Sequence, residues 1–203
     1  MFTLHASGVG SGIAIGVARI IRRADRDIPE FSINAGRVEA EIARLRRAVE
    51  RARASLVAIR DSLPAGAPEE IAAFLGIHLM MLEDPVLTDQ PAAIIRERRI
   101  NAEAALARHA GKLDAFFKGL HDPYLSGKAV DVAQVIHRIQ GELLEAADAA
   151  GGEDWAGEII VADDLSPADA IDLKRRRIAA FVTDLGGPIS HTAILARSMR
   201  IPA

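Results

Sequence analysis

The sequence predicts an α/β domain that is interrupted by an inserted helical bundle. Toward the end of the chain, two short apolar runs alternate with helical patterns, which is typical of an α/β unit. The middle of the chain carries apolar residues at steps of three and four, as amphipathic helices do. A glycine-rich stretch with β-branched residues opens the chain. We expect residues 1–30 and 149–203 to form the α/β domain and residues 31–148 to form the bundle.

The opening stretch combines glycines with an apolar run over Ile13–Ile21, which favours strands and turns. The glycines that punctuate it are Gly8, Gly10, Gly12 and Gly16. We expect this stretch to join the sheet of the α/β domain, and the bundle is then an insertion between two parts of one domain.

The first helix of the bundle is predicted by an apolar seam that is sustained over nearly four heptads. The seam consists of Val38, Ile42, Leu45, Val49, Ala52, Leu56, Ile59 and Leu63. Pro68, Glu69 and Glu70 mark the start of a second helix, because proline suits a first helical turn and acids suit its positive end. Asp84 followed by Pro85 marks a boundary after that helix.

Further helical patterns fill the rest of the middle zone. Asn101 can cap one of these helices with its side chain, and another helix follows Pro123. The apolar positions of these patterns include Leu87, Ile94, Ile95, Leu106, Leu113, Phe117, Val135, Ile136, Ile139 and Leu143. Because each apolar stripe can be buried only against another helix, the middle zone predicts a helical bundle.

The last zone alternates strands and helices. We expect strands at Glu158–Ala162 and Ile178–Val182, with a short helix between them that begins at Ser166 and Pro167. The turn Gly186–Pro188 then leads into a helix over Ser190–Met199.

The composition excludes several kinds of function. A formal net charge of −3 argues against a general nucleic-acid binder, and the lack of cysteine excludes disulfides and thiol chemistry. No leader peptide pattern opens the chain, and no run approaches the roughly 20 apolar residues of a membrane span. We expect a cytoplasmic protein that binds neither nucleic acid nor membrane. Because the chain stops directly after a helical pattern, we also expect it to be a piece of a longer protein, with the α/β domain incomplete at its C-terminal end.

His191 is the candidate for chemistry, because it follows a strand and a Gly-Gly turn and opens a helix. Helix N-termini bind anions, and phosphoryl groups suit them. A neutral imidazole is also a nucleophile near pH 7. The residues expected to position a phosphoryl group around it are Gly186, Gly187, Ser190, Thr192 and Arg197. Without further motifs, a histidine that simply caps a helix after an ordinary turn is the better interpretation.

Four segments resemble a known family. Residues 186–203 read GGPISHTAILARSMRIPA and closely resemble the phosphohistidine signature of enzymes that use phosphoenolpyruvate (PEP). Residues 8–16, 78–84 and 160–167 read GVGSGIAIG, HLMMLED and IVADDLSP, and they resemble other segments of the enzyme I family of the bacterial phosphotransferase system. The resemblance covers essentially the whole chain in the family's order.

The resemblance implies a fold and an activity. The fold is a swivelling phosphohistidine domain of the α/β class with an inserted helical bundle that binds the carrier protein HPr. The activity is transfer of a phosphoryl group from PEP to His191 and then to a histidine of HPr. The family's PEP- and Mg²⁺-binding barrel, which also forms the homodimer, is not among these 203 residues. We therefore expect a monomeric fragment without cofactor or metal that exchanges phosphate with HPr only.

The resemblance also implies a partner surface on the bundle. It places acidic residues against the basic edge of HPr, and the matching positions are Glu69, Glu70 and Asp84, with Glu83 and His78 nearby. The acids have an alternative explanation, because Glu69 and Glu70 suit a helix start and Asp84 suits a helix end. For His78, a structural role beside apolar neighbours is the alternative.

Two positions depart from the family pattern. Ile189 stands where the family usually has a threonine or serine. Ala170 stands where the family tends to have a threonine whose hydroxyl orients the active histidine, and Ser166 is the nearby substitute we considered. Two rival interpretations remain open: a non-catalytic interaction module, and the swivelling domain of an enzyme like pyruvate phosphate dikinase.

Overall fold

The protein is described by a computed structural model in which the chain forms two compact units. The α/β unit comprises Met1–Arg26, Ile59–Phe74 and Gly152–Ala203, and the helical unit comprises Asp27–Ala58 and Leu75–Gly151. The structure describes residues 3, 5–21, 28–63, 68–120, 123–145, 154–187 and 190–203. The domain boundaries expected from the sequence stay predictions.

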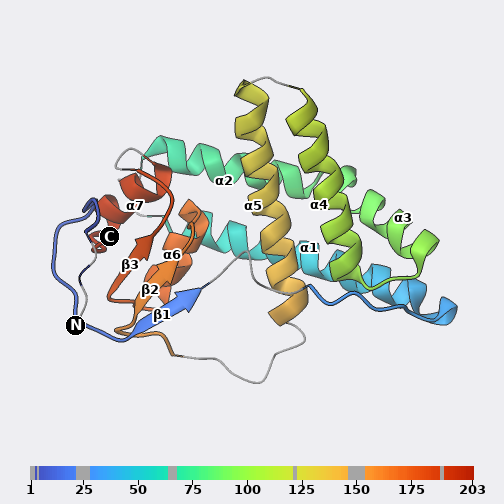
Figure 1. Cartoon of the computed structure of the whole chain (residues 1–203), viewed down its shortest axis with the longest axis horizontal. Coiled ribbons are helices and arrows are strands. Elements are labelled where there is room, and N and C mark those ends of the chain that lie inside the picture. Colours follow the sequence, from blue (N-terminus) through green and yellow to red (C-terminus); the bar gives the residue numbers. More distant parts are fainter. Residues whose placement is uncertain are drawn as a thin grey trace. The chain divides into compact units, whose positions relative to one another are not determined.

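The middle of the chain is helical, as predicted (Figure 1). Its elements are η1 (Ala35–Arg37), α1 (Val38–Asp61), α2 (Glu69–Leu82), η2 (Pro85–Leu87), α3 (Asp89–Arg98), α4 (Ala102–Gly119) and α5 (Pro123–Glu145). Among the described residues, no single helix is long and apolar enough to cross a membrane. Only α2 together with Pro85–Arg98 passes that test of length and composition, and this pair is bent by 64°.

The predicted seam of α1 is the core of the helical unit. Its members from Ile42 to Leu56 are all buried, and from the other helices Leu106, Ile139 and Leu143 are fully buried as well. Burying one such aliphatic side chain contributes about 1.5–3 kcal/mol. The heptad spacing therefore predicted both the helix and the face that it buries.

The predicted side-chain cap of α4 is wrong. Asn101 occupies the N-cap position, but its side chain makes no capping hydrogen bond. Its amide instead donates to Pro29 O and to Glu103, and its oxygen accepts the N–H of Phe31. The carboxylate of Glu41, which lies on α1, accepts the first N–H of α4 from Ala102 at 2.7 Å. A residue 61 positions away in the sequence thus completes this helix.

The α/β unit contains a small parallel sheet in the order β1-β2-β3. The strands are β1 (Ala18–Ile21), β2 (Ile159–Ala162) and β3 (Ala180–Thr183), and the helices are α6 (Pro167–Arg175) and α7 (His191–Met199). The coarse prediction of a helical bundle with a small α/β sheet is confirmed. Of the run Ile13–Ile21, which favours strands and turns, only the last four residues form a strand that pairs with β2. Ile13 and Ile15 are 94% and 93% exposed, so their β propensity finds no neighbouring strand among the described residues.

The two faces of this sheet differ in burial. Ile160 and Phe181 are paired across β2 and β3 and are both buried. On the opposite face, Ile20, Val161 and Val182 form one row across the three strands, and Ile20 and Val182 are 64% and 44% exposed. Parallel sheets are usually covered on both faces. The described part of the chain therefore covers one face and leaves an apolar row open on the other.

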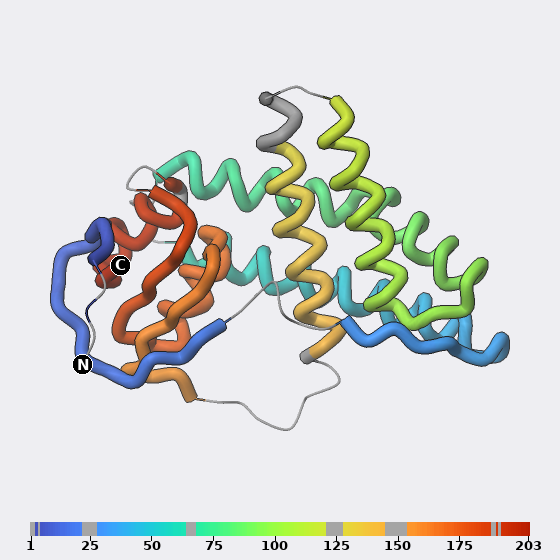
Figure 2. The backbone as a smooth tube through the Cα atoms, in the orientation of Figure 1, coloured from blue at the N-terminus to red at the C-terminus, as the bar shows by residue number. Residues whose placement is uncertain are grey.

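The first and last described residues of the α/β unit run side by side (Figure 2). The N–H of Val9 donates to Ala203 O at 2.8 Å, and Phe181 N donates to Pro202 O at 3.1 Å. A Cβ added to Gly10 would lie 2.5 Å from Ile201 O, so only glycine permits this close approach. Residues 201–203 therefore lie between β3 on one side and Val9 and Gly10 on the other.

Candidate functional site

The candidate site lies beyond the carboxyl ends of β2 and β3. Ligands of open parallel sheets bind at this edge, where strands lead into helix N-termini. β2 ends at Ala162 and is followed by α6, and β3 ends at Thr183 and is followed by α7. The first residue of α7 is His191, the candidate nucleophile.

The turn before α7 depends on one glycine. Gly186 has a φ of 100°, a conformation that side chains with a Cβ rarely adopt. The N–H of Ser190 donates to Gly187 O at 2.9 Å and closes the turn. Ile189 lies outside the described residues, as does the side chain of His191.

Ser190 is the N-cap of α7. Its backbone is extended, and its hydroxyl accepts the N–H of Ala193 at 3.2 Å. The helix thus begins where the sequence predicted. An N-cap serine satisfies only part of a helix start, so the N–H groups of the first two helical residues have no acceptor within the helix. Together with the positive end of the helix dipole, such groups attract an anion.

Thr192 takes part in a contact that the sequence did not predict. Its hydroxyl donates to the backbone oxygen of Leu165 at 2.5 Å. A threonine hydroxyl has one proton, so in this arrangement it cannot also donate to a phosphoryl oxygen. No sequence signal marks this bond, because any residue at position 165 offers a carbonyl.

Neither Ala170 nor Ser166 offers a hydroxyl that is free to orient His191 by donation. Ala170 is a fully buried residue of α6. Ser166 is the N-cap of α6: its hydroxyl donates to Asp169 at 2.5 Å and accepts the Asp169 N–H at 3.3 Å. The capping box uses the single proton of the Ser166 hydroxyl, so this hydroxyl cannot also donate to a nitrogen of His191 as an orienting threonine would.

The far end of α7 is fixed by a basic residue. Lys174, in the last turn of α6, donates from Nζ to Met199 O at 2.5 Å, where a cation also complements the helix dipole. Arg197 lies on the exposed side of α7. Six residues correspond to a rotation of about 120° from His191 around the helix axis. Arg197 thus lies on a different side of the helix, and its role near a phosphoryl group stays a prediction.

The predicted partner residues lie on α2 and directly after it. Glu69 and Glu70 are exposed in the first turn of α2. Glu83 forms an exposed ion pair with Arg53 at 3.1 Å. Asp84 is the N-cap of η2 and accepts the N–H of Val86 at 2.9 Å. Among the described residues, Glu83 is thus the predicted acid that forms a salt bridge, Asp84 is engaged as a cap, and Glu69 and Glu70 are exposed without either kind of contact.

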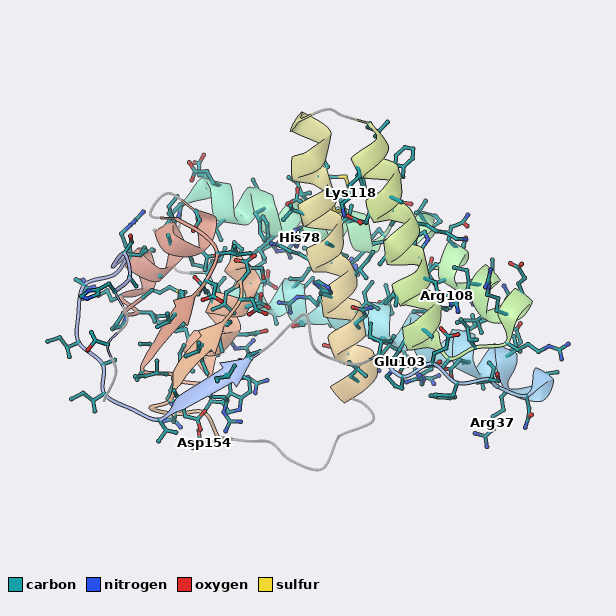
Figure 3. All side chains as sticks on the ribbon, in the orientation of Figure 1. Arg37, His78, Glu103, Arg108, Lys118 and Asp154 are labelled. Atoms are coloured by element: carbon teal, nitrogen blue, oxygen red, sulfur yellow. The ribbon has the colours of Figure 1, made fainter. Side chains whose placement is uncertain are left out.

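His78 is buried inside the helical unit rather than exposed (Figure 3). Only 3% of the residue is accessible, and its Nε2 lies 4.0 Å from Asp131 Oδ1 on α5. Burial lowers the pKa of His78 to about 4, against the opposing effect of Asp131 and with a smaller contribution from Arg138. His78 is thus neutral at pH 7 and offers almost no surface to a partner.

Acidic and histidine side chains do not cluster into a metal site in the described part of the chain. No group of three or more His, Cys, Asp or Glu side chains is arranged there to hold a metal ion.

Comparison with known proteins assigns the chain to a family. The family model described as PEP-utilising enzyme, N-terminal, matches residues 5–128, and that described as PEP-utilising enzyme, mobile domain, matches residues 155–203. The chain belongs to the PEP-utilising enzyme family.

Curated relatives carry one name. The phosphoenolpyruvate-protein phosphotransferase of Cupriavidus necator is 42% identical over 211 residues, which cover 100% of this chain and 36% of the relative. That of Geobacillus stearothermophilus is 36% identical over 201 residues, which cover 99% of this chain and 34% of the relative. The chain thus spans about a third of the length of these relatives.

Two solved structures share the fold. A solution structure of Enzyme I has a TM-score of 0.71 at 30% identity, covering 98% of this chain and 81% of that chain. The N-terminal domain of Enzyme 1 - Nitrogen has a TM-score of 0.74 at 26% identity, covering 96% and 79% respectively. The combination of helices and a small parallel sheet is that of Enzyme I N-terminal domains.

Proposed function

We propose that this chain carries a phosphoryl group on His191 and exchanges it with a histidine of an HPr-type carrier protein. The observation that carries the proposal is that α7 begins at His191 itself, behind a glycine turn at the carboxyl edge of the sheet. Membership of the PEP-utilising enzyme family supports the same chemistry.

The transfer is a displacement at phosphorus. A lone pair of the neutral His191 imidazole attacks the phosphorus of phosphorylated HPr, and the new P–N bond replaces the one to the carrier's histidine. The electron pair of the broken bond returns to the carrier's nitrogen, and each ring keeps the proton on its other nitrogen. Because the transition state is loose, the protein mainly positions the reactants and neutralises the oxygens.

The start of α7 supplies the neutralising groups in this proposal. The backbone N–H groups of the first turn and the helix dipole face the oxygens, and Gly186 and Gly187 let the backbone approach them closely. The Ser190 hydroxyl accepts from Ala193, which leaves its own proton for a phosphoryl oxygen. Thr192 and Arg197 have weaker claims, given the Thr192 bond to Leu165 and the place of Arg197 on the helix.

For the partner surface we propose Glu69 and Glu70 as the principal acids. They are exposed at the start of α2, where they can steer a basic carrier protein. Glu83 can contact a basic partner only after its ion pair with Arg53 breaks, and Asp84 continues to cap η2. His78 is buried, so this proposal gives it no contact with the partner.

For the longer protein we propose the whole reaction of the family. PEP is then the source of the phosphoryl group, Mg²⁺ acts in the part that binds PEP, and the protein is a cytoplasmic homodimer. In this proposal the α/β unit is the swivelling phosphohistidine domain, and the family model that matches residues 155–203 is described as a mobile domain. The extensive helical unit favours this assignment over a dikinase-like swivelling domain.

Phosphate exchange tests the proposal. The 203-residue chain is mixed with phosphorylated HPr in the absence of PEP, and its intact mass is followed, with His191→Ala alongside. We expect one phosphate that is labile in acid and stable in base, and none on the variant. If the folded chain gains no phosphate, the exchange proposal is rejected. Phosphate on the alanine variant would move the site to another residue.

A further inference from the structure

We propose that Thr192 is a positioning residue for His191, because its hydroxyl fixes the first turn of α7 to the loop before α6. The inference rests on the proposed function, since it concerns the delivery of the His191 imidazole to phosphorus. It differs from the sequence-based expectation, in which Thr192 itself contacts the phosphoryl group.

The hydrogen bond joins two helix starts. Thr192 is the second residue of α7, and Leu165 precedes Ser166, the N-cap of α6. The Thr192 hydroxyl lies 2.5 Å from Leu165 O, across 27 positions of sequence. Leu165 is only 4% exposed, so water is a poor substitute as the donor to its carbonyl.

The loop after β2 and the loop after β3 are hydrogen-bonded to each other near the strands, and the loop after β2 is hydrogen-bonded to the start of α7. Near the strands, the N–H groups of Asp184 and Leu185 donate to Ala162 O at 3.2 Å and to Asp163 O at 2.9 Å. Near the helices, Thr192 makes the connection. Within the part of the chain that the structure describes, no other hydrogen bond connects residues 186–192 to the loop after β2.

The position of this bond bears on the chemistry. A side-chain nitrogen about 7 Å from the axis of a helix moves by about 1 Å when the helix rotates by about 10°. A misplacement of about 1 Å can cost about 100-fold in rate. Thr192 lies next to His191 in the sequence, so its bond limits this rotation at the point where it matters most.

A purely structural role is the alternative, and the other end of α7 offers the control. Lys174 donates to Met199 O at 2.5 Å, so Lys174→Met also removes a side-chain hydrogen bond to the backbone near this helix. That bond lies at the C-terminal end, away from His191. A general loss of helix stability affects both variants, whereas a loss of positioning affects only the variant at Thr192.

The experiment is single-turnover transfer from phosphorylated HPr over a range of HPr concentrations. Thr192→Val keeps the shape of the side chain and removes the hydroxyl, whereas Thr192→Ser keeps the hydroxyl. We expect Thr192→Val to lower the maximal rate by about 10- to 100-fold without changing the half-saturating HPr concentration. Thr192→Ser and Lys174→Met should transfer as the original chain does. Circular dichroism verifies folding, and Thr192→Ala replaces the valine variant if that variant does not fold.

Equal rates for Thr192→Val and the original chain, or an equal loss in Lys174→Met, would overturn the inference while leaving the proposed function intact. If the original chain takes up no phosphate, the proposed function fails. The inference is then tested without transfer, by comparing the NMR resonances of the His191 imidazole nitrogens among the variants. A change in Thr192→Val that is reversed in Thr192→Ser supports positioning. Identical resonances in all variants reject it.

Discussion

The helices α4 and α7 both begin after a polar N-cap residue, but their first turns are completed in opposite ways. At α4, the side chain of Asn101 turns away from the helix, and the carboxylate of Glu41 accepts the N–H of Ala102. At α7, the Ser190 hydroxyl accepts one N–H, and no carboxylate among the described residues bonds to the first turn. The start of α4 is therefore neutralised by a carboxylate of the protein itself, whereas in the proposed function the start of α7 binds the phosphoryl group.

The start of α4 is surrounded by ion pairs. Arg44 donates to Glu103 at 2.8 Å and 2.5 Å and to Glu41 at 2.8 Å. Glu103 lies among α1, α4 and α5, where Arg44 also approaches Leu143 O (Figure 3). Burial alone would raise the pKa of Glu103, but the hydrogen bonds from Arg44 and Asn101 outweigh it, and the pKa is lowered. At the start of α4, the carboxylates of Glu41 and Glu103 are thus engaged in one ionic network with Arg44.

The largest expected effect on stability comes from removing Glu103 from the ionic network at the start of α4. Glu103→Ala leaves Arg44 half-buried with Glu41 as its remaining carboxylate partner, so we expect a cost of about 3 kcal/mol, the low end for removing one member of a buried ion pair. We expect that loss in the free energy of unfolding, measured with urea, and no change in phosphate exchange at a temperature where the variant is folded.

Glu39→Ala is the matched control, because Glu39 pairs with Arg96 in an exposed ion pair on the same unit. Exposed pairs contribute little, so its urea transition should coincide with that of the original chain. If both variants unfold alike, the network contributes no more than a surface ion pair, and the contrast between the two helix starts loses its energetic basis.

The interior of the helical unit gives a second prediction through pH. His78 titrates near 6.5 when unfolded but at about 4 when folded, so between these values the unfolded state binds more protons. Above pH 6.5, His78 is neutral in both states and costs the folded state nothing. As the pH falls from 6.5 toward about 4, protonation of the unfolded state lowers the free energy of unfolding. At about 1.4 kcal/mol per pKa unit, this amounts to about 3 kcal/mol.

His78→Gln provides the measurement. The free energy of unfolding is compared between variant and original from pH 7 to pH 4, and the difference between the two curves isolates the histidine. We expect the original chain to lose stability more steeply. Parallel curves would mean that His78 is protonated as easily inside the protein as in water.

Local signals predicted the helices around the candidate site better than they predicted the hydrogen bonds between distant segments. The heptad seam of α1, the Ser166-Pro167 start of α6 and the Ser190 start of α7 depend on neighbours within a few residues, and all were predicted correctly. The Glu41 cap of α4 and the Thr192 bond to Leu165 connect residues 61 and 27 positions apart. No pattern in the sequence marks either bond, because both depend on how distant segments pack.

The failures have the same physical origin. Asn101 is a residue type that favours N-caps, yet in the folded chain its amide finds better partners in Pro29, Phe31 and Glu103. The run Ile13–Ile21 has the composition of a strand throughout, but β2 pairs with only its last four residues. Intrinsic propensity allows several conformations for these residues, and tertiary contacts determine which one forms.

The glycine turn before α7 gives a smaller effect. Gly186 has a φ of 100°, so Gly186→Ala should destabilise the protein by about 1–2 kcal/mol and slow phosphate exchange. Gly187→Ala is the control for stability alone, because a Cβ there meets no atom within 4 Å and needs no left-handed backbone. Thermal unfolding followed by circular dichroism measures both. A larger loss in Gly187→Ala than in Gly186→Ala would contradict the role assigned to the turn.

The smallest change in stability tests the comparison most directly, because it converts the start of α7 into one like that of α4. Aspartate caps a helix as well as serine does, so Ser190→Asp should keep the free energy of unfolding within about 0.5 kcal/mol, whereas Ser190→Ala should lose about 1 kcal/mol. The aspartate also brings a built-in anion to the place where we expect the phosphoryl group. Exchange with phosphorylated HPr should therefore fall at least about tenfold in the aspartate variant, by repulsion between like charges, and fall less in the more weakly capped alanine variant. If the aspartate variant exchanges phosphate as fast as the original chain, the phosphoryl group does not lie at this helix start, and the first turn of α7 has no bearing on the reaction.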